Sequence, residues 1–251
     1  MFRTCLILAA CLLASNAFAA KGIVLPRHPT SAQRADIEHL LNDWPDLGRY
    51  AQDNAALAPP RAGDQRVVFM GDSITDFWGR SVGTFFPGQP YVNRGISGQT
   101  TPQMLIRFRA DVIALKPAAV VILAGTNDIA GNTGPATLAM IEDNLASMTE
   151  LARTHGIQVV LASVMPVNDD VVKDQTAQRP TGTIRALNAW IKAYASRASL
   201  VFVDYYEAMV DARGMLKKEL SDDGLHPNAA GYEVMAPLVQ SAIDRALAGK
   251  P

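Results

Sequence analysis

The chain has 251 residues, of which 49% are hydrophobic and 19% are charged, and its formal net charge is -1. This length and apolar content fit a single α/β domain with a substantial core. The balanced charge excludes the basic surface that nucleic-acid-binding proteins need, so no nucleic-acid partner is expected.

Residues 1–19 are predicted to be a secretory signal peptide. Arg3 supplies a basic start, residues 6–13 form an apolar core, and Ala17-Phe18-Ala19 is an Ala-x-Ala cleavage signal, so cleavage is expected after Ala19. The apolar run is shorter than the roughly 20 residues of a membrane span, so stable membrane insertion is not expected. A lipoprotein signal with lipidation of Cys11 is the less favoured alternative, because the apolar stretch before Cys11 is short. The protein is therefore expected to be secreted or periplasmic.

Both cysteines, Cys5 and Cys11, lie in this leader. The mature chain is therefore predicted to have neither a disulfide nor a thiolate nucleophile, although it enters an oxidising compartment.

Residues 20–60 are predicted to be a helical lead-in and linker. Ile37, Leu40, Leu41 and Trp44 recur at helical spacing, and Pro59-Pro60 ends the segment. We expect this lead-in to cover a main domain at residues 61–251.

Strands and helices alternate through that domain. Strands are predicted at residues 67–70, 91–92, 119–123, 157–162 and 200–203, and helices at residues 102–115, 135–155, 183–197 and 229–248, the last interrupted at Pro237. Such alternation indicates βαβ units and a parallel sheet whose two faces are covered by helices. Ser73, Gly95 and Asn127 each follow one of the first three strands, so all three should meet at the carboxyl edge of the sheet.

Ser73 is the candidate nucleophile and His226 the candidate base. A serine attacks an acyl carbon only with a positioned base, and the alternative role of Ser73 is a helix N-cap. Asp223 stands three residues before His226 and can hold its Nδ1–H on a tight turn. Asp223-Gly224 is also an ordinary turn signal, and Asp222 is a less favoured candidate for the orienting role.

Gly95 and Asn127 are the candidate oxyanion donors, together with the backbone N–H of Ser73. Gly95 can present its N–H without an obstructing side chain, and Asn127 carries a side-chain NH₂. The alternatives are a flexible loop at Gly95 and a helix cap at Asn127. Asp72 and Asp128 join no convergent His, Asp or Glu cluster, so neither a metal nor another cofactor is expected.

Four motifs carry a resemblance to a known family: Gly71-Asp72-Ser73, Asn93-Arg94-Gly95, Gly125-Thr126-Asn127-Asp128 and Asp223-Gly224-Leu225-His226-Pro227. In these blocks the chain resembles the SGNH hydrolases, also called GDSL esterases and lipases, from about Arg66 to Gly231. The resemblance implies a three-layer α/β/α sandwich, flavodoxin-like, with about five parallel strands. It also implies a Ser73–His226–Asp223 triad and an oxyanion hole made by Ser73, Gly95 and Asn127.

The expected reaction is hydrolysis of a carboxylic ester through an acyl-enzyme on Ser73. Since no long apolar lid is visible, we expect a short-chain or O-acetyl ester, including acetyl esters of carbohydrates. Trp78, Ile96, Met165 and Val167 are candidate substrate contacts, with core packing as the alternative for each. The other functions left open are a lysophospholipase or thioesterase for longer acyl chains and a secreted, non-catalytic carbohydrate-binding protein. The sequence does not predict an oligomeric state.

Overall fold

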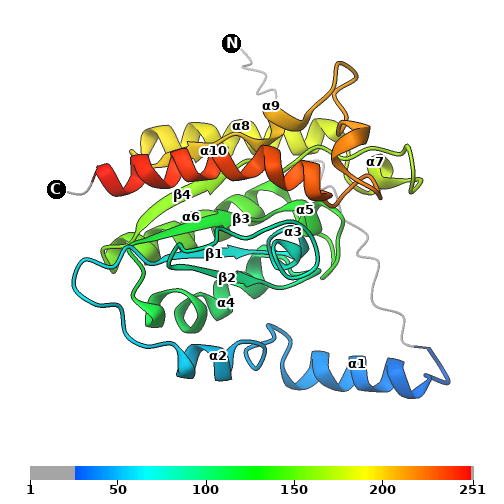
Figure 1. The fold of residues 1–251 in the computed structure, drawn as a ribbon. Helices are drawn as coiled ribbons and strands as arrows, with labels where there is room; N and C mark the ends of the chain where they lie inside the picture. Colours follow the sequence, from blue (N-terminus) through cyan, green and yellow to red (C-terminus); the bar gives the residue numbers. More distant parts are fainter. Residues whose placement is uncertain (1–25, 250–251) are drawn as a thin grey trace, which may run out of the picture.

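A computed structural model describes residues 26–249 and organises them around one sheet of five parallel strands (Figure 1). The predicted signal peptide lies outside the described residues. The strands stand in the order β2-β1-β3-β4-β5, so the expected parallel sheet and its flavodoxin-like order are confirmed. Their bounds are β1 Val67–Gly71, β2 Tyr91–Gly95, β3 Ala119–Leu123, β4 Gln158–Ala162 and β5 Val201–Val203.

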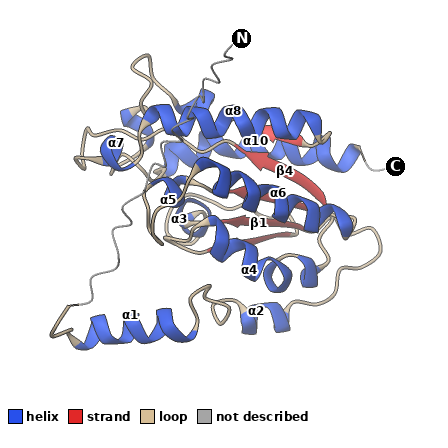
Figure 2. Cartoon of the chain, turned by 180° about the vertical axis from the view of Figure 1, so that it is seen from behind, coloured by secondary structure: helices blue, strands red, loops and turns tan. Residues whose placement is uncertain are grey.

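Helices cover both faces of the sheet, which makes the three-layer sandwich. Strand residues alternate between the two sides, so Val68 and Met70 pack on one face while Val67 and Phe69 pack on the other. One face is covered by α4 (Thr101–Asp111), α6 (Leu138–Thr154) and α8 (Thr181–Arg197), which stand before the strands in Figure 2. The opposite face is covered chiefly by α10 (Ala229–Ala248), drawn in red in Figure 1.

Short elements fill the loops between these layers. Helices α3 (Ser73–Phe77) and α5 (Thr126–Ile129) begin directly beyond β1 and β3, at the carboxyl edge of the sheet. The others are α7 (Gln175–Gln178), α9 (Tyr205–Met209) and the 3₁₀ turns η1 (Ile113–Leu115) and η2 (Lys218–Leu220).

Several predicted helix boundaries were wrong. The helix expected over residues 102–115 ends at Asp111, and a 3₁₀ turn follows it. The helix expected to open at Pro135 begins at Leu138, because the Thr137 side chain accepts the Met140 N–H and caps the helix there. The last helix is not interrupted, since α10 runs through Pro237.

The lead-in contains α1 (Ser31–Asn42) and α2 (Ala51–Ala56). Between them Tyr50 is fully buried, and its hydroxyl donates to the Gly95 carbonyl. No residue of α1 is buried, and both cartoon views show α1 standing off the body beside the carboxyl ends of the strands (Figures 1 and 2). None of the helices within residues 26–249 is both long and apolar enough to cross a lipid bilayer.

Candidate active site

Ser73, His226 and Asp223 lie in one hydrogen-bonded line. The Ser73 Oγ is 2.9 Å from His226 Nε2, and His226 Nδ1 is 2.6 Å from Asp223 Oδ2. Ser73 and His226 are 153 positions apart, so the fold brings the start of α3 to a loop far away in the sequence. This is the geometry in which a carboxylate orients an imidazole and the imidazole withdraws a proton from a hydroxyl.

The position of Ser73 is set by the turn from β1 into α3. Asp72 caps α3 by accepting the Ile74 N–H at 3.0 Å, which places Ser73 at the first helical position. The strand approaches α3 so closely that a Cβ on Gly71 would stand 2.1 Å from Thr75 Oγ1. Only glycine therefore fits at position 71, two residues before the candidate nucleophile.

Asp223 is held by its own loop. Its Oδ1 accepts the N–H groups of Leu225 and His226 at 2.9 and 2.8 Å and the Ser221 hydroxyl at 3.2 Å. Burial alone would raise the pKa of Asp223, but the hydrogen bonds from His226 and Leu225 outweigh it and lower the pKa below its ordinary value. The carboxylate therefore stays ionised beside the imidazole.

Asp222 points to a different partner. Its Oδ1 accepts from Asn228 Nδ2 at 3.1 Å, so it does not contact His226 in this arrangement. Gly224, next along the loop, has φ +83°, and its carbonyl accepts the Asn168 N–H at 2.9 Å.

Asn127 is buried, and its side-chain amide is fixed by a residue that the sequence did not single out. Asn127 Nδ2 donates one hydrogen bond to the Gln99 carbonyl at 3.0 Å, and its second N–H has no acceptor among the described residues. Gln99 is itself held by Arg107, whose Nε donates to Gln99 Oε1 at 2.5 Å. No local pattern in the sequence marks Gln99 for this role.

The structure does not support the expected role of Gly95 as an oxyanion donor. Its N–H already donates to Asn93 Oδ1 at 2.9 Å, and a Cβ on Gly95 would stand 2.1 Å from the Asp76 nitrogen. Gly95 is therefore explained by close backbone packing. The N–H of Gly98, in the same loop, has no acceptor within the part of the chain that the structure describes.

Three of the four expected substrate contacts lie in the core, where Trp78, Met165 and Val167 are each 2% exposed. Ile96 is 6% exposed and belongs to neither core cluster, but it lines a cavity beside the loop after β2. The aromatic ring beside the triad is that of Phe77, whose centroid lies 5.0 Å from that of His226.

Buried charges surround the site. Asp128 accepts the Thr101 N–H and hydroxyl, which ties α5 to α4. Arg179 donates to Thr126 Oγ1 at 3.1 Å, next to Asn127. Within residues 26–249 no three His, Cys, Asp or Glu side chains converge in a way that could hold a metal ion.

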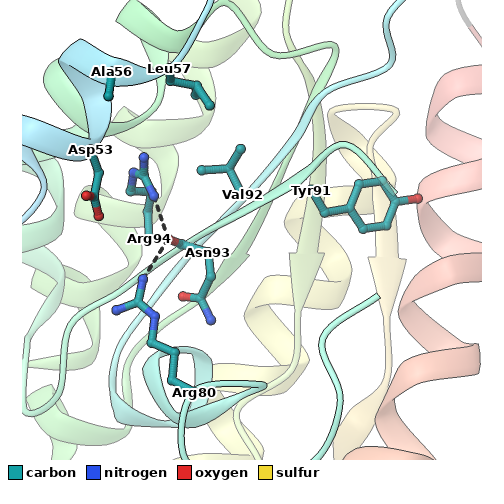
Figure 3. Close-up of a pocket in the computed structure, with 8 residues that line it drawn as sticks. All are labelled: Asp53, Ala56, Leu57, Arg80, Tyr91, Val92, Asn93 and Arg94. Atoms are coloured by element: carbon teal, nitrogen blue, oxygen red, sulfur yellow. Dashed lines mark hydrogen bonds between the residues drawn. The ribbon is translucent and has the colours of Figure 1, made fainter. Parts of the chain in front are cut away.

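Figure 3 shows a pocket of about 410 Å³ between α2 and β2. In it Arg94 and Arg80 both donate to the Asn93 carbonyl, at 2.8 and 3.3 Å. None of the triad residues lines this pocket. Its two arginines hold the end of β2 in place, and the Asn93 side chain there in turn holds the Gly95 N–H.

Comparisons with known proteins identify the family of the chain. The model of the GDSL-like lipase/acylhydrolase family matches residues 69–234, about two thirds of the chain. The chain is 44% identical in sequence to a GDSL-like lipase from Bacteroides thetaiotaomicron, whose crystal structure matches it with a TM-score of 0.75. The match covers 81% of this chain and 100% of that one.

Two curated relatives add to this. An acetylxylan esterase of Geobacillus stearothermophilus is 25% identical over 206 residues, which are 68% of this chain and 90% of the relative. The uncharacterized lipoprotein YqeF of Bacillus subtilis is 30% identical over 139 residues, which are 49% of this chain. The match spans 57% of the length of YqeF. The chain therefore belongs to the GDSL-like lipase/acylhydrolase family of the SGNH hydrolase superfamily and is a serine ester hydrolase.

Proposed function

We propose that Ser73, His226 and Asp223 form the catalytic triad. Ser73 Oγ attacks the acyl carbon while His226 Nε2 takes its proton, and the tetrahedral intermediate collapses as His226 protonates the leaving alcohol. Water, deprotonated by His226, then attacks the acyl-enzyme, and the second tetrahedral intermediate releases the acid as His226 returns the proton to Ser73 Oγ. The observation that carries this proposal is the continuous line from Ser73 Oγ through His226 to Asp223 Oδ2, at 2.9 and 2.6 Å.

Three donors are proposed to stabilise the oxyanion by hydrogen bonds: the Ser73 N–H, the second N–H of Asn127 Nδ2 and the Gly98 N–H. Each lacks an acceptor among the described residues, whereas the Gly95 N–H is occupied. Donors without a partner are what a developing negative charge needs, because no existing hydrogen bond must first be broken.

The proposed substrate is a short-chain or O-acetyl ester, with a carbohydrate acetyl ester as the leading case. Three of the four apolar side chains expected to line an acyl pocket, Trp78, Met165 and Val167, are packed in the core, which favours a short acyl group over a long one. The acetylxylan esterase relative supports a carbohydrate ester.

The proposal also places the protein outside the cytoplasm. The basic residue, apolar run and Ala17-Phe18-Ala19 signal support cleavage of residues 1–19 and a secreted or periplasmic product. Residues 61–251 are then the hydrolase domain, and residues 20–60 its lead-in.

Replacement of Ser73 tests the triad. Ser73→Ala should abolish hydrolysis of p-nitrophenyl acetate and labelling by a fluorophosphonate probe, while exposed Ser81→Ala should retain both. Turnover by folded Ser73→Ala at the wild-type rate would remove Ser73 from its role.

A panel of p-nitrophenyl esters from acetate to laurate tests the acyl preference. The value of kcat/KM should be highest for acetate and fall with chain length. A maximum of kcat/KM at long acyl chains would instead favour the hypothesis of a lysophospholipase or thioesterase.

A further inference from the structure

A cavity of about 460 Å³ lies between the lead-in and the loop that follows β2. His39, Trp44 and Asp46 of the lead-in line one side of it. Gly98, Gln99 and Asn132 are among the residues that line the other. The lead-in residues precede the segment matched by the family model, so this wall is contributed by a part of the chain that the family pattern does not include.

The wall is built into the fold by buried hydrogen bonds. Gln103, 7% exposed, donates through Nε2 to the Trp44 carbonyl at 2.7 Å. Gln99, 3% exposed, donates through Nε2 to the Pro45 carbonyl at 2.8 Å. These two buried side chains hold the backbone at Trp44 and Pro45, so the point from which the indole projects is fixed.

The cavity shares part of its wall with the proposed oxyanion site through Gly98 and Gln99, while Ser73, His226 and Asn127 do not line it. The Gln99 carbonyl that fixes Asn127 and the Gly98 N–H that is free for an oxyanion belong to residues in its wall. A group bound in the cavity would therefore lie beside the oxyanion site and remain part of the same substrate molecule.

The lining combines the aromatic face of Trp44 and the aliphatic side chains of Leu40 and Ile96 with polar side chains. Trp44 is half-buried and, with Thr133, also lines a neighbouring hollow of about 360 Å³. Asn132 donates to the Gly98 carbonyl at 3.0 Å, while its Oδ1 accepts from no described residue. Asp46 Oδ1 lies 3.7 Å from His39 Nε2 at the opposite wall, where His39 is half-exposed.

This chemistry matches a sugar ring better than an acyl chain. A pyranose offers an apolar C–H face for the indole and hydroxyl groups at its rim for amide and carboxylate side chains. An acyl chain would leave these polar groups without partners when it displaced water from them.

We propose that this cavity is a glycosyl subsite that holds the sugar carrying the scissile ester, with Trp44 packed against the ring. The inference rests on the proposed function, since it names the alcohol part of the ester that Ser73 cleaves. It makes Trp44 a specificity-determining residue from outside the catalytic motifs.

The test compares one substrate that has the sugar with one that lacks it. Trp44→Ala should raise the KM for acetylated xylo-oligosaccharides roughly tenfold and leave kcat/KM for p-nitrophenyl acetate unchanged. Trp44→Phe should recover part of the loss, because it keeps an aromatic face. Leu41→Ala is the matched control, since Leu41 is 80% exposed on α1 and does not line the cavity.

A binding measurement separates the subsite from turnover. In the Ser73→Ala background, calorimetric titration with an acetylated xylo-oligosaccharide should show binding that Trp44→Ala weakens by the same factor. Equal losses on both esters, or unchanged oligosaccharide binding in Trp44→Ala, would overturn the subsite. Hydrolysis of p-nitrophenyl acetate without any oligosaccharide turnover or binding would also overturn it, while leaving the esterase intact. Failure of the wild-type protein on every ester would instead overturn the proposed function.

Discussion

Asp223 receives four hydrogen bonds from three residues of its own loop: the ring and backbone of His226, the backbone of Leu225 and the hydroxyl of Ser221. Three of them converge on Oδ1, which leaves Oδ2 for His226 Nδ1. An ionised Asp223 can only accept from Nδ1, so the imidazole is held with Nε2 toward Ser73, in the tautomer that the proposed proton transfer needs.

Asp223→Asn should therefore lower kcat by a factor on the order of 10³ to 10⁴ while the fold persists. An asparagine can keep the backbone contacts, but it can present its NH₂ to Nδ1 and favour the tautomer in which Nε2 carries the proton. Steady-state kinetics on p-nitrophenyl acetate measures the loss. Asp222→Asn is the matched control, because Asp222 bonds Asn228 and should leave kcat unchanged. If Asp222→Asn caused the larger loss, the two roles would be exchanged.

Asn127 should act on the barrier and not on substrate affinity. Asn127→Ala removes a donor aimed at the oxyanion, which exists only at and beyond the transition state, so kcat should fall about 10² to 10³-fold, or roughly 3 kcal/mol, with KM little changed. An unchanged kcat would remove Asn127 from the oxyanion hole. Asn132→Ala, which alters the neighbouring cavity wall, should act mainly on KM for sugar esters.

The sequence could single out candidate residues where the proposed role depends on chemical type, but it could not show which backbone groups are already hydrogen-bonded. Ser73, His226 and Asp223 could be chosen because nucleophile, base and carboxylate have distinct side chains. Gly95 and Gly98 offer the same N–H, and only the bond from Gly95 to Asn93 Oδ1 distinguishes them. Trp78 and Met165 could not be assigned to pocket or core until their neighbours were known.

At the scale of elements, buried strands were the most predictable because their apolar runs are continuous. β3 occupies residues 119–123 as predicted. Helix ends were less predictable, since they depend on caps, as the start of α6 after Thr137 shows. The short helices α3 and α5 carry no periodic signal, because four or five residues do not complete two turns.

Pro237 shows packing overriding a local signal. It is exposed, while Met235 and Val239 on either side are buried against the sheet, so α10 continues despite a missing N–H. Pro237→Ala should restore a helical hydrogen bond and raise the free energy of unfolding by about 1–3 kcal/mol, as urea denaturation would measure.

Pro135→Ala serves as the contrast for that prediction. Pro135 stands in the loop before α6, outside any helix, so its replacement should lower stability by up to about 1 kcal/mol through greater freedom of the unfolded chain. Equal changes in the two variants would mean that Pro237 imposes no helical cost.

The whole molecule concentrates buried charge at the carboxyl edge of its sheet. Asp72, Asp128, Arg107 and Arg179 are each at most 5% exposed. Arg107 and Asp111 form an ion pair at 3.0 Å, and Asp128 is bonded by Thr101. Asp72 differs, because its Oδ2 has no hydrogen-bond partner among the described residues. Such a carboxyl is the one whose ionisation the fold opposes most directly.

The ionisation of Asp72 should make the stability of the protein depend on pH. Burial raises its pKa from 3.8 to about 7, with Asp128 adding to the rise and the Ile74 N–H opposing it. Between these values the native state binds more protons than the unfolded chain, so the free energy of unfolding falls as pH rises through that window and levels off above it. At 1.36 kcal/mol per unit, the loss amounts to about 4 kcal/mol.

Asp72→Asn removes this titration and keeps an oxygen that can accept the Ile74 N–H, so its stability should fall about 3 kcal/mol less than that of the wild type between pH 4 and pH 7. Urea unfolding at several pH values measures the difference of the two curves, in which the contributions of other groups cancel. Exposed Asp174→Asn should run parallel to the wild type. If the curve of unfolding free energy against pH for Asp72→Asn were also parallel to that of the wild type, Asp72 would be ionised throughout this pH range. The carboxyl edge of the sheet would then hold the Asp72 charge without the free-energy cost that its burial implies.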